Sequence, residues 1–344
     1  MENRLPSAER SSNIFYLDMV RICAIYLVLL LHALDPWLSI ADIYGTNLWF
    51  VGNIINPIER MGVPLFFMLS GYLTLSDPRT LDIGAFYKRR LPRILLPFLI
   101  WSGIYYVAAN YSALSLGAFL DGLLNQEIKY HLWYVYVLIG MYMLAPFIKK
   151  MVDSCTEKQV FLLFLLVLFP VTILPFFRFL THIRVFGFTT MMEGYWGFFI
   201  FGYLLGKYPP QRKHRLLMYV LGIAAWAGSI VGNLLSSSAE AISLPFNTGY
   251  NIAHYMTAGA FFVLVQSLAP KLEASLPAAP IKYWAGCTYG MYLCHVLVME
   301  VCNAILPFEK PILIVFIGFL ATALCSTAFT LILGRIKPLR KVFL

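Results

Sequence analysis

Three ionisable residues lie inside the first long apolar stretch of the chain. The stretch is residues 14–34, IFYLDMVRICAIYLVLLLHAL, and it contains Asp18, Arg21 and His32. A helix turns about 100° per residue, so the eleven steps from Arg21 to His32 end about 20° past three full turns. Both side chains therefore share one face, and Asp18 lies one turn before Arg21, within pairing reach. Charged residues inside an apolar span are costly and usually mark a functional site.

The chemistry of these three side chains suggests a catalytic stripe. His32 could take a proton from an attacking hydroxyl, because imidazole exchanges protons near neutral pH, or it could carry an acyl group transiently. The alternative is a buried histidine that only bonds a neighbouring helix. Arg21 is permanently charged and could bind an anionic substrate or polarise the site. Alternatively, Arg21 and Asp18 form a structural pair that offsets the burial of both, and we expect Asp18 to orient Arg21.

The overall composition indicates a membrane environment for this stripe. Of the 344 residues, 60% are hydrophobic and only 12% are charged, and the mean hydropathy is +0.74. A soluble domain is nearer to half apolar and a quarter charged. The sequence therefore predicts an all-α polytopic membrane protein. The six cysteines show no ligand spacing, so neither a metal site nor a disulfide framework is predicted.

The apolar stretches predict about ten transmembrane helices. They lie near residues 14–34, 48–75, 92–110, 131–148, 160–177, 190–207, 215–235, 247–268, 282–305 and 311–334. The flanks on one side carry 20 of the 26 Lys and Arg residues, and those on the other side carry four. The positive-inside rule therefore places both termini in the cytoplasm.

This topology defines three segments and explains the charge of the chain. We expect a cytoplasmic N-terminal segment at 1–13, a membrane domain at 14–335 and a cytoplasmic tail at 336–344. The first span lacks a small-residue cleavage site, so we expect it to remain as a membrane anchor. Because topology accounts for the net charge of +9, the expected partner is membrane lipid, and no nucleic acid is expected.

Further polar residues fall inside the predicted spans, mostly in their outer half. Glu59 and Arg60 lie near mid-depth, and as helix neighbours they point about 100° apart, so each needs a partner on another helix. His131 lies at the outer boundary of its span, Glu193 opens another span on the same side, and His295 lies at or beyond mid-depth. These depths predict a polar cavity that opens outward.

Aromatic residues accompany two of these histidines. Trp133 follows His131 at the membrane boundary, where an aromatic belt is one interpretation and a sugar-binding face is another. Tyr289, Tyr292 and His295 are spaced three apart and share a helix face, which suits either a substrate site or helix packing.

Two other local patterns concern packing and charge. Gly71, in the sequence LSGY, indicates close helix packing. A basic patch between the second and third spans could hold phosphate groups, or it could reflect topology alone. Its members are Lys88, Arg89, Arg90 and Arg93.

Five sequence blocks resemble one known family. Residues 16–33, YLDMVRICAIYLVLLLHA, resemble the first span of the membrane-bound type 3 acyltransferases, in which an arginine, ten residues and a histidine form the hallmark. The other blocks follow in the family's order at 60–73, 87–97, 130–146 and 288–295. The resemblance is nearest to the short ten-span subgroup that includes the enterobacterial common antigen O-acetyltransferase. Arg60 matches that subgroup's pattern, and Glu59 does not.

The resemblance implies an O-acetyltransferase of the bacterial inner membrane. Such an enzyme takes acetyl groups from cytoplasmic acetyl-CoA and modifies a sugar hydroxyl of a cell-surface or lipid-linked glycan, with a small metabolite as a further possible acceptor. Donor entry is expected near the basic patch, and His32 would then activate the acceptor hydroxyl or relay the acetyl group.

Two other functional classes can be compared with this prediction. A transporter or flippase of a small anion or lipid-linked sugar would also use intramembrane charges, but the chain shows no inverted repeat. A glycosyltransferase that uses lipid-linked sugars would be expected to carry large outer loops, whereas those predicted here are short.

Overall fold

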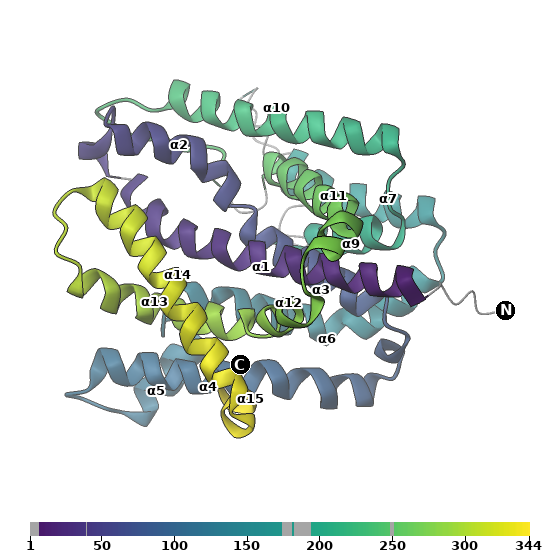
Figure 1. Cartoon of the computed structure of the whole chain (residues 1–344), viewed down its shortest axis with the longest axis horizontal. Helices are drawn as coiled ribbons and strands as arrows, with labels where there is room; N and C mark the ends of the chain where they lie inside the picture. The colour runs from purple at the N-terminus through teal and green to yellow at the C-terminus, as the bar shows by residue number, and fades with distance from the viewer. Residues whose placement is uncertain (1–6, 39, 174–180, 182–193, 248–250) are drawn as a thin grey trace. The chain divides into compact units, whose positions relative to one another are not determined.

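The computed structural model describes residues 7–38, 40–173, 181, 194–247 and 251–344. Every regular element in these residues is helical, which confirms the predicted all-α class (Figure 1). Glu193 and parts of the spans expected at 160–177, 190–207 and 247–268 lie outside the described residues. The chain divides into two compact units, and each is described by itself.

The first unit joins the N-terminal part of the chain to a later segment, Met1–Asp77 with Met151–Ala285. Within it α1 packs against α2, α3, α11 and α12. Its described elements are α1 (Ser7–Leu38), the 3-10 turn η1 (Ala41–Ile43), α2 (Asn47–Glu59), α3 (Gly62–Leu75), α7 (Glu157–Leu168), the π-helical turn η4 (Phe169–Ile173), α9 (Trp196–Lys207), α10 (Arg212–Ser236), α11 (Ile252–Ser275) and α12 (Ala278–Ala285).

The second unit comprises Pro78–Lys150 and Gly286–Leu344. Within it α13 packs against α14 and α4, and the short last helix lies against α4. Its elements are η2 (Pro78–Leu81), α4 (Ile83–Asn110), α5 (Leu116–Leu124), η3 (Tyr130–Leu132), α6 (Trp133–Asp153), which continues past the boundary of the unit, α13 (Thr288–Ile305), α14 (Pro311–Arg335) and α15 (Lys337–Phe343).

Several helices are long and apolar enough to cross a membrane. Six helices of the described part meet this condition, and α12 together with α13 would count as a seventh if the two helices form one span. The six are Phe15–Leu38, Ile83–Asn110, Tyr130–Asp153, Arg212–Ser236, Ile252–Ser275 and Pro311–Arg335. The total of ten spans and the cytoplasmic location of both termini stay predictions.

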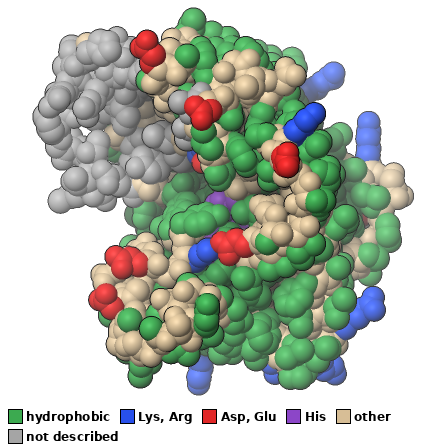
Figure 2. Space-filling view, turned by 90° about the vertical axis from the view of Figure 1, so that its left-hand side faces the viewer, with side chains coloured by type: hydrophobic (Ala, Val, Ile, Leu, Met, Phe, Trp, Pro, Cys, Tyr) green, Lys and Arg blue, Asp and Glu red, His purple; other side chains and the backbone are tan. Residues whose placement is uncertain are grey.

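The surface of the protein suits contact with lipid. Hydrophobic side chains cover much of the face shown in Figure 2. On α10, Leu216 and Ile223 are 64% and 63% exposed, and on α14, Leu324 is 72% exposed. Large apolar side chains in such positions are unfavourable in water, so these helix faces are suited to the hydrocarbon core of a bilayer.

Among the described helices of the first unit, α3 and α9 approach each other very closely. A Cβ atom built on Gly71 would lie 1.8 Å from the carbonyl oxygen of Phe199, and one on Gly202 would lie 2.0 Å from that of Met68. Only glycine lets the two backbones approach so closely, which is how small residues act at membrane helix interfaces. Gly71 therefore has the packing role that its sequence predicts.

The segment expected to form one span at 48–75 is two helices, α2 and α3, separated at Arg60 and Met61. Pro64 explains the break, because it has no N–H group to donate to the carbonyl of Arg60, four residues earlier. The amide of Met61 instead bonds the carbonyl of Ile58 at 3.1 Å, and regular helical bonding resumes with Leu65. Arg60 therefore caps α2 rather than lying inside a continuous helix.

Candidate functional site

The break after α2 places Arg60 in a polar network that also contains Asp35, Asn56 and Glu59. We call these four residues the Arg60 network. The guanidinium of Arg60 donates to the Asp35 carboxylate on α1, to Asn56 Oδ1 at 3.3 Å and to the backbone carbonyl of Asn247 at 2.8 Å. The Arg60 side chain is only 15% exposed, so these partners supply the hydrogen bonds that water would otherwise provide.

Glu59 is the most deeply buried member of the network. Its side chain is fully buried, and its Oε1 accepts a hydrogen bond of 3.0 Å from Asn56 Nδ2. The same Nδ2 lies 3.5 Å from Asp35 Oδ1, so Asn56 links the two acids. Glu59 Oε2 is enclosed by the protein and has no hydrogen-bond partner within the described residues.

The histidine of the first span lies beside this network. His32 is half-buried on α1, and Asp35 follows it by three residues, so the two side chains share a helix face. Because Asp35 binds Arg60, the face of α1 that carries His32 also carries a carboxylate held by a cation. A hydroxyl-bearing substrate at this face would meet a proton acceptor together with fixed charges.

Asp18 and Arg21 form a separate pair further toward the start of α1. Arg21 Nη1 lies 3.3 Å from Asp18 Oδ1, and the two side chains are 28% and 11% exposed. This spacing is one helical turn, as the sequence suggests. Arg21 therefore has a local partner that offsets its charge, and about three turns separate it from His32 along α1.

The second unit contains its own buried cluster around His131. The rings of His131 and His295 have centroids 5.1 Å apart, and both side chains are almost fully buried. The hydroxyl of Tyr292 donates to the carbonyl of His131, and Tyr105 packs edge-on against the His131 ring at 5.2 Å. The structure thus brings together three candidates, His131, Tyr292 and His295, from segments more than 150 residues apart.

Trp133 stands at the edge of this cluster. Its ring lies 6.5 Å from that of Tyr134 in an edge-on arrangement, and it is half-buried at the start of α6. Tyr134 in turn contacts Tyr292 with ring centroids 5.2 Å apart. Trp133 therefore reaches the His131 cluster through Tyr134.

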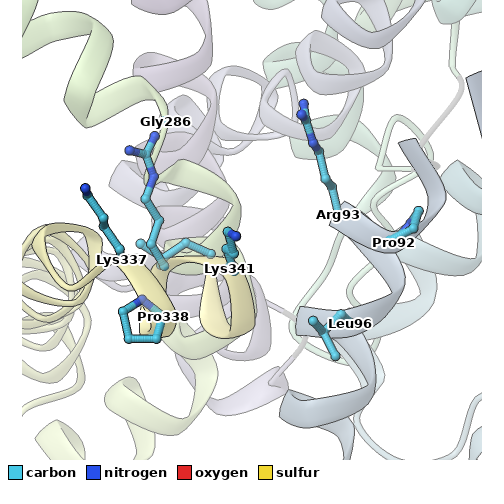
Figure 3. Close-up of a pocket in the computed structure, with 9 residues that line it drawn as sticks. Pro92, Arg93, Leu96, Gly286, Lys337, Pro338 and Lys341 are labelled. Atoms are coloured by element: carbon cyan, nitrogen blue, oxygen red, sulfur yellow. The ribbon is translucent and has the colours of Figure 1, made fainter. Parts of the chain in front are cut away.

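Of the four candidates in the basic patch, Arg93 lines a pocket in the second unit. The pocket has a volume of about 1020 Å³ and lies between α4 and α15 (Figure 3). We call it the basic pocket; its lining residues are Pro92, Arg93, Leu96, Gly286, Lys337, Pro338, Arg340, Lys341 and Leu344. Lys88, Arg89 and Arg90 are on the same helix but are not among these residues.

Several of these residues were not anticipated from the sequence. Asp35 lies three residues after His32, and Asn56 lies four residues before Arg60. Polar residues at helical spacing were therefore a usable signal. The cations of α15 were used only to assign topology; they are Lys337, Arg340 and Lys341. No feature of the nearby sequence predicts that α15 lies beside α4.

The chemistry available at these sites is that of proton transfer and anion binding. The described residues hold no group of three or more His, Cys, Asp and Glu side chains that could bind a metal ion. The first unit offers the imidazole of His32 beside the Arg60 network, and the second unit offers a buried histidine pair and the basic pocket.

Comparisons with known proteins agree with an acyl-transfer function. The profile of one family, described as an acyltransferase domain, matches residues 14–331, nearly the whole chain. No curated protein and no solved structure matches the chain. The family match favours an enzyme over a transporter, and it spans the residues of the Arg60 network and His32.

Proposed function

We propose, because this chain belongs to the membrane-bound type 3 acyltransferase family, that it moves an acetyl group from acetyl-CoA to a sugar hydroxyl. The acceptor would belong to a cell-surface or lipid-linked glycan, and the enzyme would lie in the bacterial inner membrane with both termini in the cytoplasm. Resemblance to the enterobacterial common antigen O-acetyltransferase subgroup supports the donor and the acceptor class.

One observation carries the proposal. His32 shares a helix face with Asp35, and Asp35 is held by Arg60 at the break between α2 and α3. An imidazole beside fixed polar groups suits general-base catalysis, because its proton affinity matches the task and its surroundings hold the reactants in place.

The proposed role of His32 is to remove the proton from the acceptor hydroxyl. The acceptor oxygen forms the new bond to the acetyl carbon, the carbon–sulfur bond breaks, and the proton passes from His32 to the departing thiolate. The products are the O-acetylated sugar and free CoA. A variant of this mechanism has His32 accept the acetyl group first and pass it to the hydroxyl in a second step.

The Arg60 network would position the acceptor. The partly exposed Asp35 carboxylate can accept a hydrogen bond from a sugar hydroxyl, whereas the fully buried Glu59 holds Asn56 in place. Arg60 supplies a fixed positive charge that favours the oxyanion formed during attack. Acetyl-CoA, when bound, supplies the activated thioester.

The test is transfer of labelled acetyl from acetyl-CoA by the purified protein in liposomes, with a mixed extract of envelope glycans as acceptor. Wild type is compared with His32→Gln, which keeps a polar side chain but cannot act as a base. The matched control is His214→Gln, since His214 is exposed near the start of α10.

We expect label in a glycan fraction with wild type and His214→Gln, and a loss of at least about 100-fold with His32→Gln, the usual scale of general-base catalysis. Full transfer by His32→Gln at normal protein levels would contradict the mechanism. Binding of acetyl-CoA without transfer to any glycan would contradict the acceptor class.

A further inference from the structure

Cationic side chains dominate the polar lining of the basic pocket. Four of its nine lining residues have cationic side chains, namely Arg93, Lys337, Arg340 and Lys341, and none has an acidic side chain. Among the described residues none of the four forms an ion pair with an acidic side chain. Like charges gathered in one cavity repel one another, and a bound anion would offset that repulsion.

The last helix is a fixed wall of this pocket. The indole N–H of Trp101 on α4 donates to the carbonyl of Phe343 at 3.3 Å, and the two rings pack edge-on with centroids 6.1 Å apart. Leu344 lies directly against Gly290 of α13, where an added Cβ would come within 2.0 Å of its side chain. Lys337 and Lys341 rise from this anchored helix, and Arg93 rises from α4 on the facing side (Figure 3).

The size and the remaining lining indicate what kind of anion would fit. A volume of about 1020 Å³ is at the upper end of the range of about 300–1,000 Å³ for small-molecule sites, and it exceeds the needs of one inorganic phosphate. Leu96, Pro92, Pro338 and Leu344 add apolar surface for an uncharged part of the ligand. Arginine and lysine side chains together are the usual partners of phosphate oxygens.

We propose that the basic pocket binds the phosphate groups of the acyl donor, with α15 supplying Lys337, Arg340 and Lys341 opposite Arg93. The ligand is a molecule with several phosphates joined to an apolar body, and this assignment rests on the proposed function for the identity of the donor. It adds the C-terminal helix to the donor site, which the basic patch on α4 alone does not suggest. An anionic phospholipid shares the phosphate chemistry, so the test separates the two sources.

The test measures CoA binding by full-length protein in phosphatidylcholine nanodiscs. One variant is Lys337→Gln, Arg340→Gln and Lys341→Gln together. The control is Arg212→Gln, Lys213→Gln and Arg215→Gln together, which removes the same charge from the start of α10, outside the pocket. A single variant, Lys341→Gln, serves if the triple variant is poorly folded, because it changes only one of the three cationic residues of α15.

We expect the α15 triple variant to weaken CoA binding by about 30-fold or more and the single variant by about 3- to 10-fold, since each charge-assisted bond to phosphate contributes strongly. The α10 control should change it by less than about twofold, the scale of screened surface charges. The KM for acetyl-CoA should rise with the Kd, and dephospho-CoA should lose less affinity than CoA on mutation.

Four outcomes would overturn the assignment. Equal losses in the two triple variants would show a general charge effect. Unchanged CoA binding, together with loss of affinity for phosphatidylglycerol vesicles, would make the pocket a lipid site. If the wild type transfers acetyl and the α15 variants keep the same KM for acetyl-CoA, donor binding in the basic pocket is refuted and the proposed function stands. A wild-type protein that neither binds CoA nor transfers acetyl would refute both proposals.

Discussion

The ion pair between Arg60 and Asp35 provides a quantitative test of the Arg60 network. Arg60→Met keeps most of the side-chain volume and removes the guanidinium, and Asp35→Asn removes the opposing charge. In the first variant, Asp35, Asn56 and the carbonyl of Asn247 each lose a donor. The double variant removes both charges together, so comparing the four proteins isolates the contribution of the pair.

The burial of the pair sets the expected magnitude. Breaking a buried ion pair costs about 3–5 kcal/mol and breaking an exposed one about 0–1 kcal/mol. The Arg60 side chain is 15% exposed and that of Asp35 is 36% exposed, so we place the cost of Arg60→Met between these limits, at about 2 kcal/mol. The first unit has roughly 210 residues, for which 1 kcal/mol shifts Tm by about 2–4 °C. The expected loss is therefore about 4–8 °C.

The assay is thermal unfolding of the purified variants in one detergent, followed by tryptophan fluorescence. The double variant should be more stable than the sum of the single losses predicts, by a coupling energy of about 1–2 kcal/mol. Arg212→Met, at an exposed position on α10, should change Tm by less than about 2 °C. Strict additivity of Arg60→Met and Asp35→Asn would refute the pair, and with it the placement of Arg60 beside the His32 face.

Two further variants test the packing of each unit by the same assay. Gly71→Ala would put a Cβ atom 1.8 Å from a backbone oxygen of α9 and should lower the free energy of unfolding by about 1–3 kcal/mol. The control Gly103→Ala meets no atom within 4 Å, so it should be neutral or stabilising. Equal effects of the two variants would contradict the close contact between α3 and α9. Tyr292→Phe removes the hydroxyl that donates to His131 and should cost about 1 kcal/mol, whereas Tyr111→Phe, at an 81% exposed position, should have no effect.

Features set by local spacing could be predicted from the sequence. The pairing distance of Asp18 and Arg21 follows from their separation by one helical turn, and the structure has this pair at 3.3 Å. The packing role of Gly71 follows from the small size of glycine inside an apolar helix. The all-α class follows from long apolar stretches, because helices satisfy their own backbone groups in lipid.

The break between α2 and α3 had a sequence signal that was not used. Pro64 lies four residues after Arg60, where its missing N–H removes one helical bond. Composition still favours one long span at 48–75, because both helices are apolar and hydropathy averages over the break. Hydropathy therefore located the segment but not the position of Arg60 at a helix end.

Contacts between distant segments could not be predicted in the same way. Arg60 bonds the backbone carbonyl of Asn247, 187 residues away, and a backbone carbonyl carries no mark of residue type. The basic pocket depends on Phe343 and Leu344 holding α15 against Trp101 and Gly290. Charge counting explained the cations of α15 by topology, and only the docking of that helix reveals them as one wall of a cavity.

The amide of Asn56 explains how two acids and one cation can share so small a space. An arginine side chain only donates hydrogen bonds and an ionised carboxylate only accepts them, so a residue that bonds to both must accept from one and donate to the other. Asn56 Oδ1 accepts from Arg60, while its Nδ2 donates to Glu59 and faces Asp35. Neither an aspartate nor a leucine at this position could satisfy both sides. The orientation of Asn56 is thus fixed by its neighbours, and Asn56 in turn holds Glu59 and Arg60 beside the α1 face that carries His32.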